Sequence, residues 1–375
     1  MTFFLIFSAL VLLIYSVIVL FAVLKIKVPI KTNQIPGILH GFTYTIIIPF
    51  RNEIENLTHI LSDLKQLNFV KDRFEVIFID DNSSDGSFEF LENSELPKNF
   101  KLLRALKDGK KQAIAQAISS ASGSYIYTID ADCRLHPDLL RKVDDMVMVK
   151  KPGLLIQPVI SYHGNSLLSR FQYYDYLSLM GINKAVVDFN GQPALASAAN
   201  LIFNKETFET LKPFNDNLNI SSGDDMFLLR SFLKEDHQSV FLNYTPENLV
   251  ITNPEKSWPH LIKQRIRWTG KMRRFSSSIS FFLGMLSMVV QIVFISLFVL
   301  GLSYQVNYIL FFLCFWLFKS LLDYLFFKKT ALLLGQKASW FEVLILEPLY
   351  MIFVPVVILL SLFVHPKWKG RKISH

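Results

Sequence analysis

The sequence predicts an α/β domain with a parallel sheet, joined to helices that cross a membrane. The chain of 375 residues is 51% hydrophobic and has a positive mean hydropathy, which is too apolar for a purely soluble protein of this size. Long segments near both ends carry no charge. Between them, apolar runs rich in β-formers alternate with helical stretches.

The first element is a membrane helix. Thr2 to Leu24 contains no charged residue and is long enough to cross a hydrocarbon core of about 30 Å. A cleaved signal peptide is the alternative, but no basic region precedes the apolar run and no small-residue cleavage site follows it. We therefore expect the helix to be retained.

The C-terminal region predicts about three further spans. Phe275 to Phe318 is uncharged and is interrupted by a polar turn near Gly301 to Asn307, which suits two helices, and Val343 to Val364 forms the third. We expect these helices to pack together and to bury the charges that lie among them: Lys319, Asp323 and Glu347.

Basic residues place the middle of the chain on the cytoplasmic side of a cell's inner or plasma membrane. They follow the first helix and precede the second, at Lys25, Lys27, Lys31, Lys263, Arg265, Arg267, Lys271, Arg273 and Arg274. Four spans would put the basic tail (Lys367, Lys369, Arg371 and Lys372) outside, so a re-entrant or interfacial segment stays open. These clusters explain the net charge of +8, and we expect membrane lipids as partners and no nucleic acid.

The middle of the chain alternates strands and helices. Predicted strands are 44–50, 74–80, 100–106 and 124–130, and predicted helices are 54–67, 87–92 and 110–121. Continuous apolar strands between helices indicate a parallel sheet covered on both faces. We therefore divide the chain into an N-terminal helix (1–25), an α/β domain (40–256), an interfacial helix (257–275) and a C-terminal membrane region (276–375).

Polar clusters follow three of the predicted strands: "FRNE", "DDNSSDGS" and "DADC". Ligands bind at the carboxyl ends of parallel strands, so these clusters predict one site along a sheet edge. Simpler interpretations stay open: Asp80 to Ser87 suits a turn and helix cap, and Asp132 alone suits an ordinary loop. Cys133 has no other Cys or His at ligand spacing and is not expected to bind metal or act as a nucleophile.

The spacing of Asp130 and Asp132 predicts phosphate chemistry. If the strand continues through Asp130, both side chains project to the same side, about 6 to 7 Å apart along the backbone. Two such carboxylates suit Mg²⁺ or Mn²⁺ with coordination positions left for phosphate oxygens. A divalent cation neutralises charge on a leaving diphosphate.

Seven motifs together resemble the membrane-bound family 2 glycosyltransferases, whose catalytic domain has the GT-A fold, a Rossmann-like mixed sheet. The motifs are "TIIIPFRNE", "FIDDNSSDGS", "GKKQAIAQAI", "YTIDADC", "ASAANLIFNKETF", "SGDDMFLLRSF" and "QRIRW", and the resemblance covers about residues 43 to 275. The flanking helices resemble that family's too.

The resemblance implies a role for each matching residue. Asp130 and Asp132 match the metal-binding DxD motif, and Asp225 matches the general base. Donor binding is implied for Glu53, Asp80, Asp81, Lys110 and Asp130, and contact with the diphosphate or acceptor for Asp224, Gln264, Arg267 and Trp268. Two alternatives stay open, because Asp225 suits a helix N-terminus and Gln264 with Arg267 suits an amphipathic helix at the membrane surface.

The expected protein is thus an inverting, metal-dependent glycosyltransferase of the hexosyltransferase type. It would move a sugar from a nucleotide-sugar, with a UDP-sugar favoured, to a lipid or glycan at the cytoplasmic face, using Mg²⁺ or Mn²⁺. A processive polysaccharide synthase and an inactive GT-A membrane scaffold are the alternatives. Single transfer to a lipid is preferred, because a synthase needs a channel and the chain has few helices.

Overall fold

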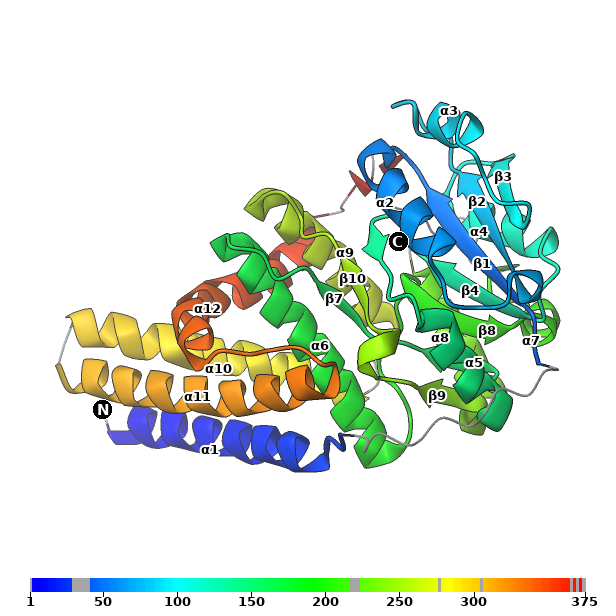
Figure 1. The fold of residues 1–375 in the computed structure, drawn as a ribbon. Coiled ribbons are helices and arrows are strands. Elements are labelled where there is room, and N and C mark those ends of the chain that lie inside the picture. The colour runs from blue at the N-terminus through cyan, green and yellow to red at the C-terminus, as the bar shows by residue number, and fades with distance from the viewer. Residues whose placement is uncertain are drawn as a thin grey trace. The chain divides into compact units, whose positions relative to one another are not determined.

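The computed structural model describes residues 2–28, 41–215, 223–275, 278–303, 306–364, 367–368 and 371–372 (Figure 1). The chain forms two compact units. The sheet unit comprises Pro29–Tyr162, Leu195–Asn253 and Lys372–His375, and the membrane unit comprises Met1–Val28, His163–Ala194 and Pro254–Arg371. The predicted basic residues Lys31 and Lys369, and residue 40 at the expected domain start, lie outside the described residues.

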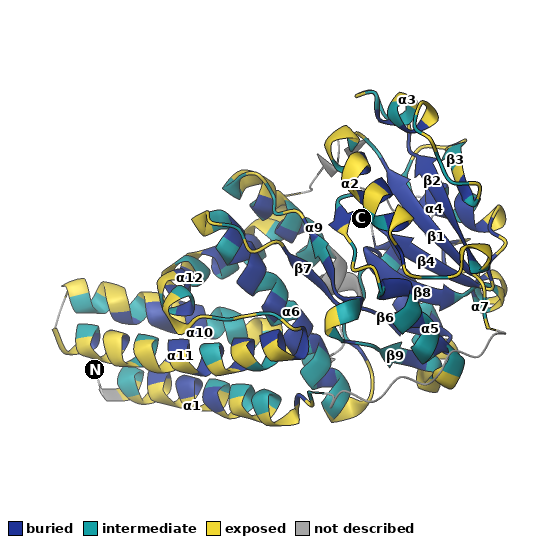
Figure 2. Cartoon of the chain, viewed as in Figure 1, coloured by how far each residue is buried: buried dark blue, intermediate teal, exposed yellow. Residues whose placement is uncertain are grey.

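A seven-stranded mixed sheet forms the centre of the sheet unit. Its order is β3 (Phe100–Arg104), β2 (Phe74–Asp80), β1 (Tyr44–Phe50), β4 (Tyr125–Ile129), β8 (Asn200–Asn204), β6 (Leu154–Ile156) and β9 (Val240–Leu242). The strands β1 to β4 pair in parallel as predicted, whereas β8 runs antiparallel to both its neighbours. Every residue of β1, β2 and β4 is buried, which explains their continuous apolar sequences (Figure 2).

Amphipathic helices accompany this sheet: α2 (Ile54–Lys65), α3 (Ser87–Glu92), α4 (Lys110–Ser119), α5 (Leu139–Lys150), α7 (Lys205–Leu211) and α8 (Asp224–Glu235). In α2 the buried residues Leu57, Ile60, Leu61 and Leu64 recur at helical spacing and define one apolar face. Short 3₁₀ helices, η1 (Lys71–Arg73), η3 (His237–Ser239) and η4 (Pro246–Asn248), complete the unit.

A second, three-stranded sheet was not predicted. It has the order β5 (Cys133–Arg134), β10 (Val250–Thr252) and β7 (Val159–Ser161), with β10 antiparallel to β5 and parallel to β7. Because β5 begins directly after Asp132, this small sheet continues from the "DAD" turn.

The membrane unit is helical. It contains α1 (Thr2–Lys25), α6 (Leu167–Asn190), α9 (Trp258–Phe275), α10 (Ser278–Ser303), α11 (Val306–Leu333) and α12 (Trp340–Phe363), and Lys367–Trp368 pairs with Arg371–Lys372 as β11 and β12. By length and composition, four of the described helices can cross a membrane: Phe3–Lys25, Phe281–Ser303, Val306–Leu333 and Trp340–Phe363. The four predicted apolar helices are therefore confirmed. Helix α10 ends at Ser303 and α11 begins at Val306, both within the stretch Gly301 to Asn307 where a turn was expected.

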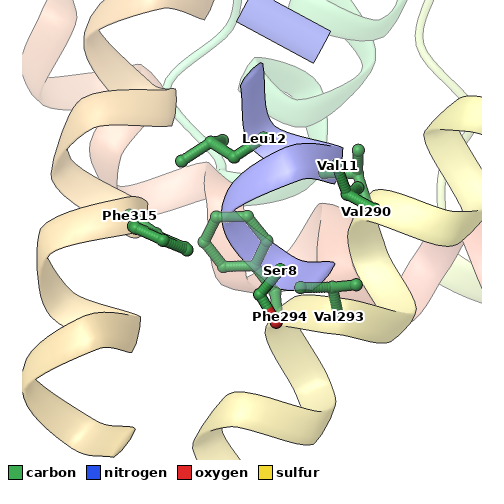
Figure 3. A pocket seen from close by; sticks show the side chains of 7 residues that line it. All are labelled: Ser8, Val11, Leu12, Val290, Val293, Phe294 and Phe315. Atoms are coloured by element: carbon green, nitrogen blue, oxygen red, sulfur yellow. The ribbon is translucent and has the colours of Figure 1, made fainter. Parts of the chain in front are cut away.

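Helices α1, α10 and α11 lie side by side (Figure 1). Figure 3 shows the apolar crevice between them, which is lined by Ser8, Val11, Leu12, Val290, Val293, Phe294 and Phe315. The crevice is too small to hold a water molecule. The contact therefore depends on dry side-chain packing.

Helix α6 belongs to the membrane unit, although its residues fall inside the interval 40–256 that the sequence assigned to the α/β domain. It packs against α1, α11 and α12. Gly181 allows the close approach, since a Cβ there would lie 2.4 Å from Thr330 Oγ1 and 2.5 Å from the Phe326 ring. The sequence did not indicate that α6 belongs with the membrane helices, because α6 mixes apolar and polar residues and is too polar to be predicted as a membrane span.

The charges inside the apolar region are buried, as predicted. Lys319 donates to Asp323 at 2.6 Å and to Glu347 at 2.8 Å, and the hydroxyl of Tyr15 also donates to Asp323. This buried network joins α1, α11 and α12, because each helix contributes a partner.

Candidate active site

Acidic residues gather in the sheet unit where strands β1, β2 and β4 end. Nearby backbone adopts left-handed conformations, with φ of 53° at Asn52, 56° at Asn82, 116° at Gly109 and 96° at Gly223. Such conformations are costly for Asn and easy for Gly, and they concentrate at functional sites.

Asp130 and Asp132 lie in a turn and not in a strand. Strand β4 ends at Ile129, and the Cys133 amide donates to the Asp130 carbonyl at 3.2 Å. The expected continuation of the strand through Asp130 is therefore wrong, and the spacing argument that depended on it does not apply. The two acids nevertheless influence each other, because the charge of Asp130 raises the pKa of Asp132.

Asp132 has an unfavourable environment for a carboxylate. Burial, followed by the charges of Asp130 and Glu53, raises its pKa to about 6. A hydrogen bond opposes this rise, since Thr252 Oγ1 donates to Asp132 Oδ2 at 2.8 Å. The site thus collects negative charge that a cation would stabilise.

Lys110 connects Asp130, in the turn after β4, with the acids that begin α8. Its Nζ lies 2.5 Å from Asp130 Oδ1. Burial alone would lower the pKa of Lys110, but the charges of Asp130, Asp224 and Asp225 raise it. The structure therefore brings together Lys110, the Asp130 and Asp132 pair, and the two acids that begin α8.

Asp225 lies in the first turn of α8, and its Oδ1 accepts a hydrogen bond from the Met226 amide at 2.8 Å. This contact fits the simpler interpretation of a helix N-terminal acid. Asp224 is 8% exposed. The charge of each acid acts on Lys110, so the helix start and the DxD turn share one electrostatic environment.

Asp80 and Asp81 are almost fully buried, at 1% and 2% exposure. Asp80 Oδ1 accepts from the amide and hydroxyl of Ser83, which supports the turn interpretation. Asp81 Oδ1 accepts from the Gly109 amide at 2.7 Å, and burial raises its pKa. Asp81 therefore fixes the loop that leads into Lys110.

Glu53 is held by polar neighbours. Its amide donates to Ser87 Oγ at 2.9 Å, and its Oε2 accepts from Asn56 Nδ2 at 2.6 Å. Asn253 Nδ2 in turn donates to Asn56 Oδ1 at 2.9 Å. Since its charge also raises the pKa of Asp132, Glu53 belongs to the same acidic group.

Cys133 is buried, and burial together with the charges of Asp132 and Asp130 raises the pKa of its thiol well above the ordinary value. A thiol in this state is a poor nucleophile and a poor metal ligand.

Gln264, Arg267 and Trp268 lie on α9 in the membrane unit. Gln264 Nε2 donates to Glu255 Oε1 at 2.7 Å, and Gln264 Oε1 accepts from Arg265. The guanidinium of Arg265 lies 4.0 Å from the centre of the Trp268 ring.

Arg265 itself was counted among the membrane-flanking cations, but it is only 6% exposed and donates to Asp175 at 2.5 Å. It therefore joins α9 to α6 and does not face lipid phosphate. Gln264 and Trp268 enclose this buried cation.

Two carboxylates alone do not complete a metal site. The described residues contain no group of three or more His, Cys, Asp or Glu side chains placed to hold an ion. Asp130 and Asp132 nevertheless fit Mg²⁺ or Mn²⁺, because both are hard oxygen donors, Asp132 is destabilised by like charge, and diphosphate oxygens would supply further ligands.

Sequence reasoning missed Thr252, Asn56 and Asn253. Each contacts a predicted acid or its partner, yet Thr252 is separated from Asp132 by 120 positions. The only signal was polar side chains at the end of a short apolar run, a pattern that most loops share.

Comparisons with known proteins agree with this fold. Residues 45–209 match the model of the family Glycosyl transferase family 2. The poly-beta-1,6-N-acetyl-D-glucosamine synthase of Staphylococcus epidermidis is 24% identical over 238 residues, covering 63% of this chain and 54% of the synthase. Glycosyltransferase AglE of Haloferax volcanii is 26% identical over 182 residues, covering 48% of this chain and 58% of AglE. The chain thus spans little more than half the length of these curated relatives.

One further curated relative and one solved structure are also similar to this chain. The undecaprenyl-phosphate 4-deoxy-4-formamido-L-arabinose transferase of Aeromonas hydrophila is 30% identical over 108 residues, covering 28% of this chain and 33% of that enzyme. The mannosyltransferase PcManGT from Pyrobaculum calidifontis, solved with GDP-Man and Mn²⁺, superposes with a TM-score of 0.62 over 96% of this chain and 97% of its own, at 14% identity. At that identity the likeness shows the fold. Residues 45–209 therefore match a family 2 glycosyltransferase domain, and the fold is GT-A.

Proposed function

We propose that the protein transfers a sugar from a nucleotide diphosphate sugar to a lipid or glycan acceptor, with inversion at the sugar carbon, at the cytoplasmic face of a membrane. The observation that carries the proposal is the convergence of Asp130, Asp132, Asp224 and Asp225 around Lys110. The names of three relatives describe transfer or polymerisation of sugars, one of them with undecaprenyl phosphate as acceptor.

The donor would lie along the ends of β1, β2 and β4. Asp80, Asp81 and Glu53 would contact its nucleoside, and the Lys110 ammonium would exchange part of its contact with Asp130 for the diphosphate. UDP is the nucleotide that the sequence favours, and the fold neighbour was solved with GDP-Man, so both bases need to be tested.

Asp130 and Asp132 would hold Mg²⁺ or Mn²⁺ beside the diphosphate. When bound, the cation supplies positive charge where negative charge develops on the leaving group. The fold neighbour that was solved with Mn²⁺ supports this choice.

Asp225 would act as the general base. The acceptor hydroxyl oxygen forms a bond to the sugar C1, and the bond from C1 to the diphosphate oxygen breaks, with its electron pair leaving on the nucleoside diphosphate. The acceptor proton passes to Asp225, because a neutral hydroxyl is a weak nucleophile. Attack from the face opposite the leaving group inverts the configuration at C1.

The acceptor would reach the site from the membrane. Four helices that can span it, together with Gln264, Arg267 and Trp268 on α9, fit an acceptor that carries a lipid. Single transfer is the preferred version, and processive synthesis is the second candidate because one relative is named as a polysaccharide synthase.

Release of nucleoside diphosphate tests the proposal. The purified protein in lipid is incubated with a panel of UDP-, GDP- and dTDP-sugars, Mg²⁺ or Mn²⁺ and a lipid extract. With at least one donor it should release the nucleoside diphosphate, by transferring the sugar or by hydrolysing the donor. Asp132→Asn and Asp225→Asn should each lower transfer by at least a hundredfold while the proteins stay folded. Unchanged transfer in both variants would show that the mechanism is wrong, and silence across the panel would favour an inactive scaffold.

A further inference from the structure

The carboxylate of Asp132 lies against the end of β10. Thr252 of β10 and Cys133 of β5 are opposite one another in the antiparallel pair, so their side chains share one face. Thr252 Oγ1 donates to Asp132 Oδ2 at 2.8 Å, and Cys133 Sγ lies 3.7 Å from Asp132 Oδ1. Each carboxylate oxygen therefore faces one member of this pair.

Of these two neighbours, only the hydroxyl is a strong donor, since a thiol donates weakly. Thr252 is 7% exposed, so water cannot easily replace its hydroxyl. The hydrogen bond from Thr252 therefore restrains rotation of the Asp132 carboxylate.

The next residue holds another acid of the same group. Asn253 Nδ2 donates to Asn56 Oδ1 at 2.9 Å, and Asn56 Nδ2 donates to Glu53 Oε2 at 2.6 Å. Thr252, the last residue of β10, thus contacts Asp132 directly, and Asn253, the next residue, is linked to Glu53 through Asn56. Such an arrangement fixes the acids relative to one another.

We propose that Thr252 is a positioning residue of the cation site, whose hydroxyl orients Asp132 toward Mg²⁺ or Mn²⁺. This role rests on the proposed function of Asp130 and Asp132 as cation ligands. Groups that hydrogen-bond to a metal ligand set its orientation, and their loss costs about 10-fold to 100-fold in metal affinity.

Direct Mn²⁺ binding to the full-length protein in detergent tests the role without relying on transfer. Electron paramagnetic resonance would measure free Mn²⁺ during titration, first alone and then with UDP or GDP. Thr252→Val keeps the shape and removes the hydroxyl, and should weaken Mn²⁺ binding about 10-fold to 100-fold. Thr252→Ser keeps the hydroxyl and should stay within about threefold of the unmodified protein.

Ser161 provides the matched control. It lies opposite Thr252 on β7 and is fully buried, and its Oγ has no hydrogen-bond partner among the residues that the structure describes. Ser161→Ala should leave Mn²⁺ affinity unchanged. Melting temperatures of all variants check folding, and Thr252→Ala replaces Thr252→Val if the latter does not fold.

Equal Mn²⁺ affinity in Thr252→Val and the unmodified protein would overturn the role, as would an equal loss in Thr252→Ser. Sugar transfer without any Mn²⁺ binding would also overturn it, while leaving the proposed transfer standing. Weakened binding in Thr252→Val, in a protein that transfers no sugar from any donor, would support the role and count against the proposed function.

Discussion

Asp132 is a residue whose position costs stability in the absence of a cation. Its pKa of about 6 means that the folded protein binds a proton there more tightly than the unfolded chain does, because the ordinary value for Asp is about 3.9. Above pH 6 the carboxylate is ionised in a half-buried acidic group. The same charge that destabilises the fold prepares the site for a cation.

Removing that charge should stabilise the protein. In EDTA at pH 7.5, Asp132→Asn should melt a few degrees higher than the unmodified protein, because one of several neighbouring like charges is gone while Thr252 keeps an acceptor. As the pH falls from 6 toward 4 the difference should shrink, since Asp132 becomes protonated in the folded protein. Differential scanning fluorimetry at several pH values measures this effect.

Mn²⁺ should reverse the order at pH 7.5, raising the melting temperature of the unmodified protein only. A destabilised Asp132→Asn at pH 7.5 in EDTA would contradict the charge argument.

At the scale of elements, the buried network of Lys319 joins three membrane helices. Lys319 is 3% exposed and Glu347 is 3% exposed, and both lie far from water in an apolar bundle. A buried pair contributes little net stability compared with apolar residues, but removing one partner leaves uncompensated charge. The network is therefore sensitive to single changes and tolerant of joint ones.

Lys319→Met should destabilise the membrane unit by about 3–5 kcal/mol, because Asp323 and Glu347 then lose their shared cation. The triple variant Lys319→Met, Asp323→Asn, Glu347→Gln should recover most of that loss. Thermal unfolding in detergent, followed by intrinsic fluorescence, compares the three proteins. A single variant as stable as the unmodified protein would show that the network has no structural role.

Elements with strong local patterns were predicted best. Strands β1 and β2 begin and end where the sequence placed them, since seven consecutive buried positions leave a continuous apolar run. Strands β6, β7, β9 and β10 have three residues each and carry no such pattern. Their pairing depends on contacts between distant segments, which one sequence does not display.

The sequence predicted the part of the candidate site that lies at the ends of the long strands, and not the part that depends on the small sheet. The rule for parallel strand ends placed Glu53, Asp80 and Asp130 along one edge, because Asp80 is the last residue of β2 and the other two follow β1 and β4. The same rule says nothing about a turn such as the one around Asp132. Thr252 reaches that turn through the small sheet, whose existence local sequence did not indicate.

At the scale of the whole molecule, the two units are interleaved along the chain. The chain passes between them after residues 28, 162, 194, 253 and 371. Helix α6 buries Phe171, Tyr173, Tyr174 and Leu177 within the membrane unit, although both neighbouring segments belong to the sheet unit. No single cut therefore separates a complete sheet unit from a complete membrane unit.

A fragment of residues 41–253 should consequently aggregate without detergent, because α6 loses its partners α1, α11 and α12. The same fragment with residues 164–193 replaced by a Gly-Ser linker should stay monomeric for longer. Size-exclusion chromatography with light scattering distinguishes the two. A monomeric 41–253 fragment in plain buffer would show that α6 does not need the membrane helices.

Because the two units alternate along the chain, α6 is synthesised well before a helix that it packs against. Helix α6 leaves the ribosome about 120 residues before α11, the partner that packs against Gly181. At typical translation speeds of about 5–20 residues per second, the apolar side chains of α6 lack their α11 contacts for on the order of ten seconds. During that interval the nascent chain would depend on chaperones, lipid headgroups or the already inserted α1 for cover, so slow translation of the last third should lower the yield of folded protein.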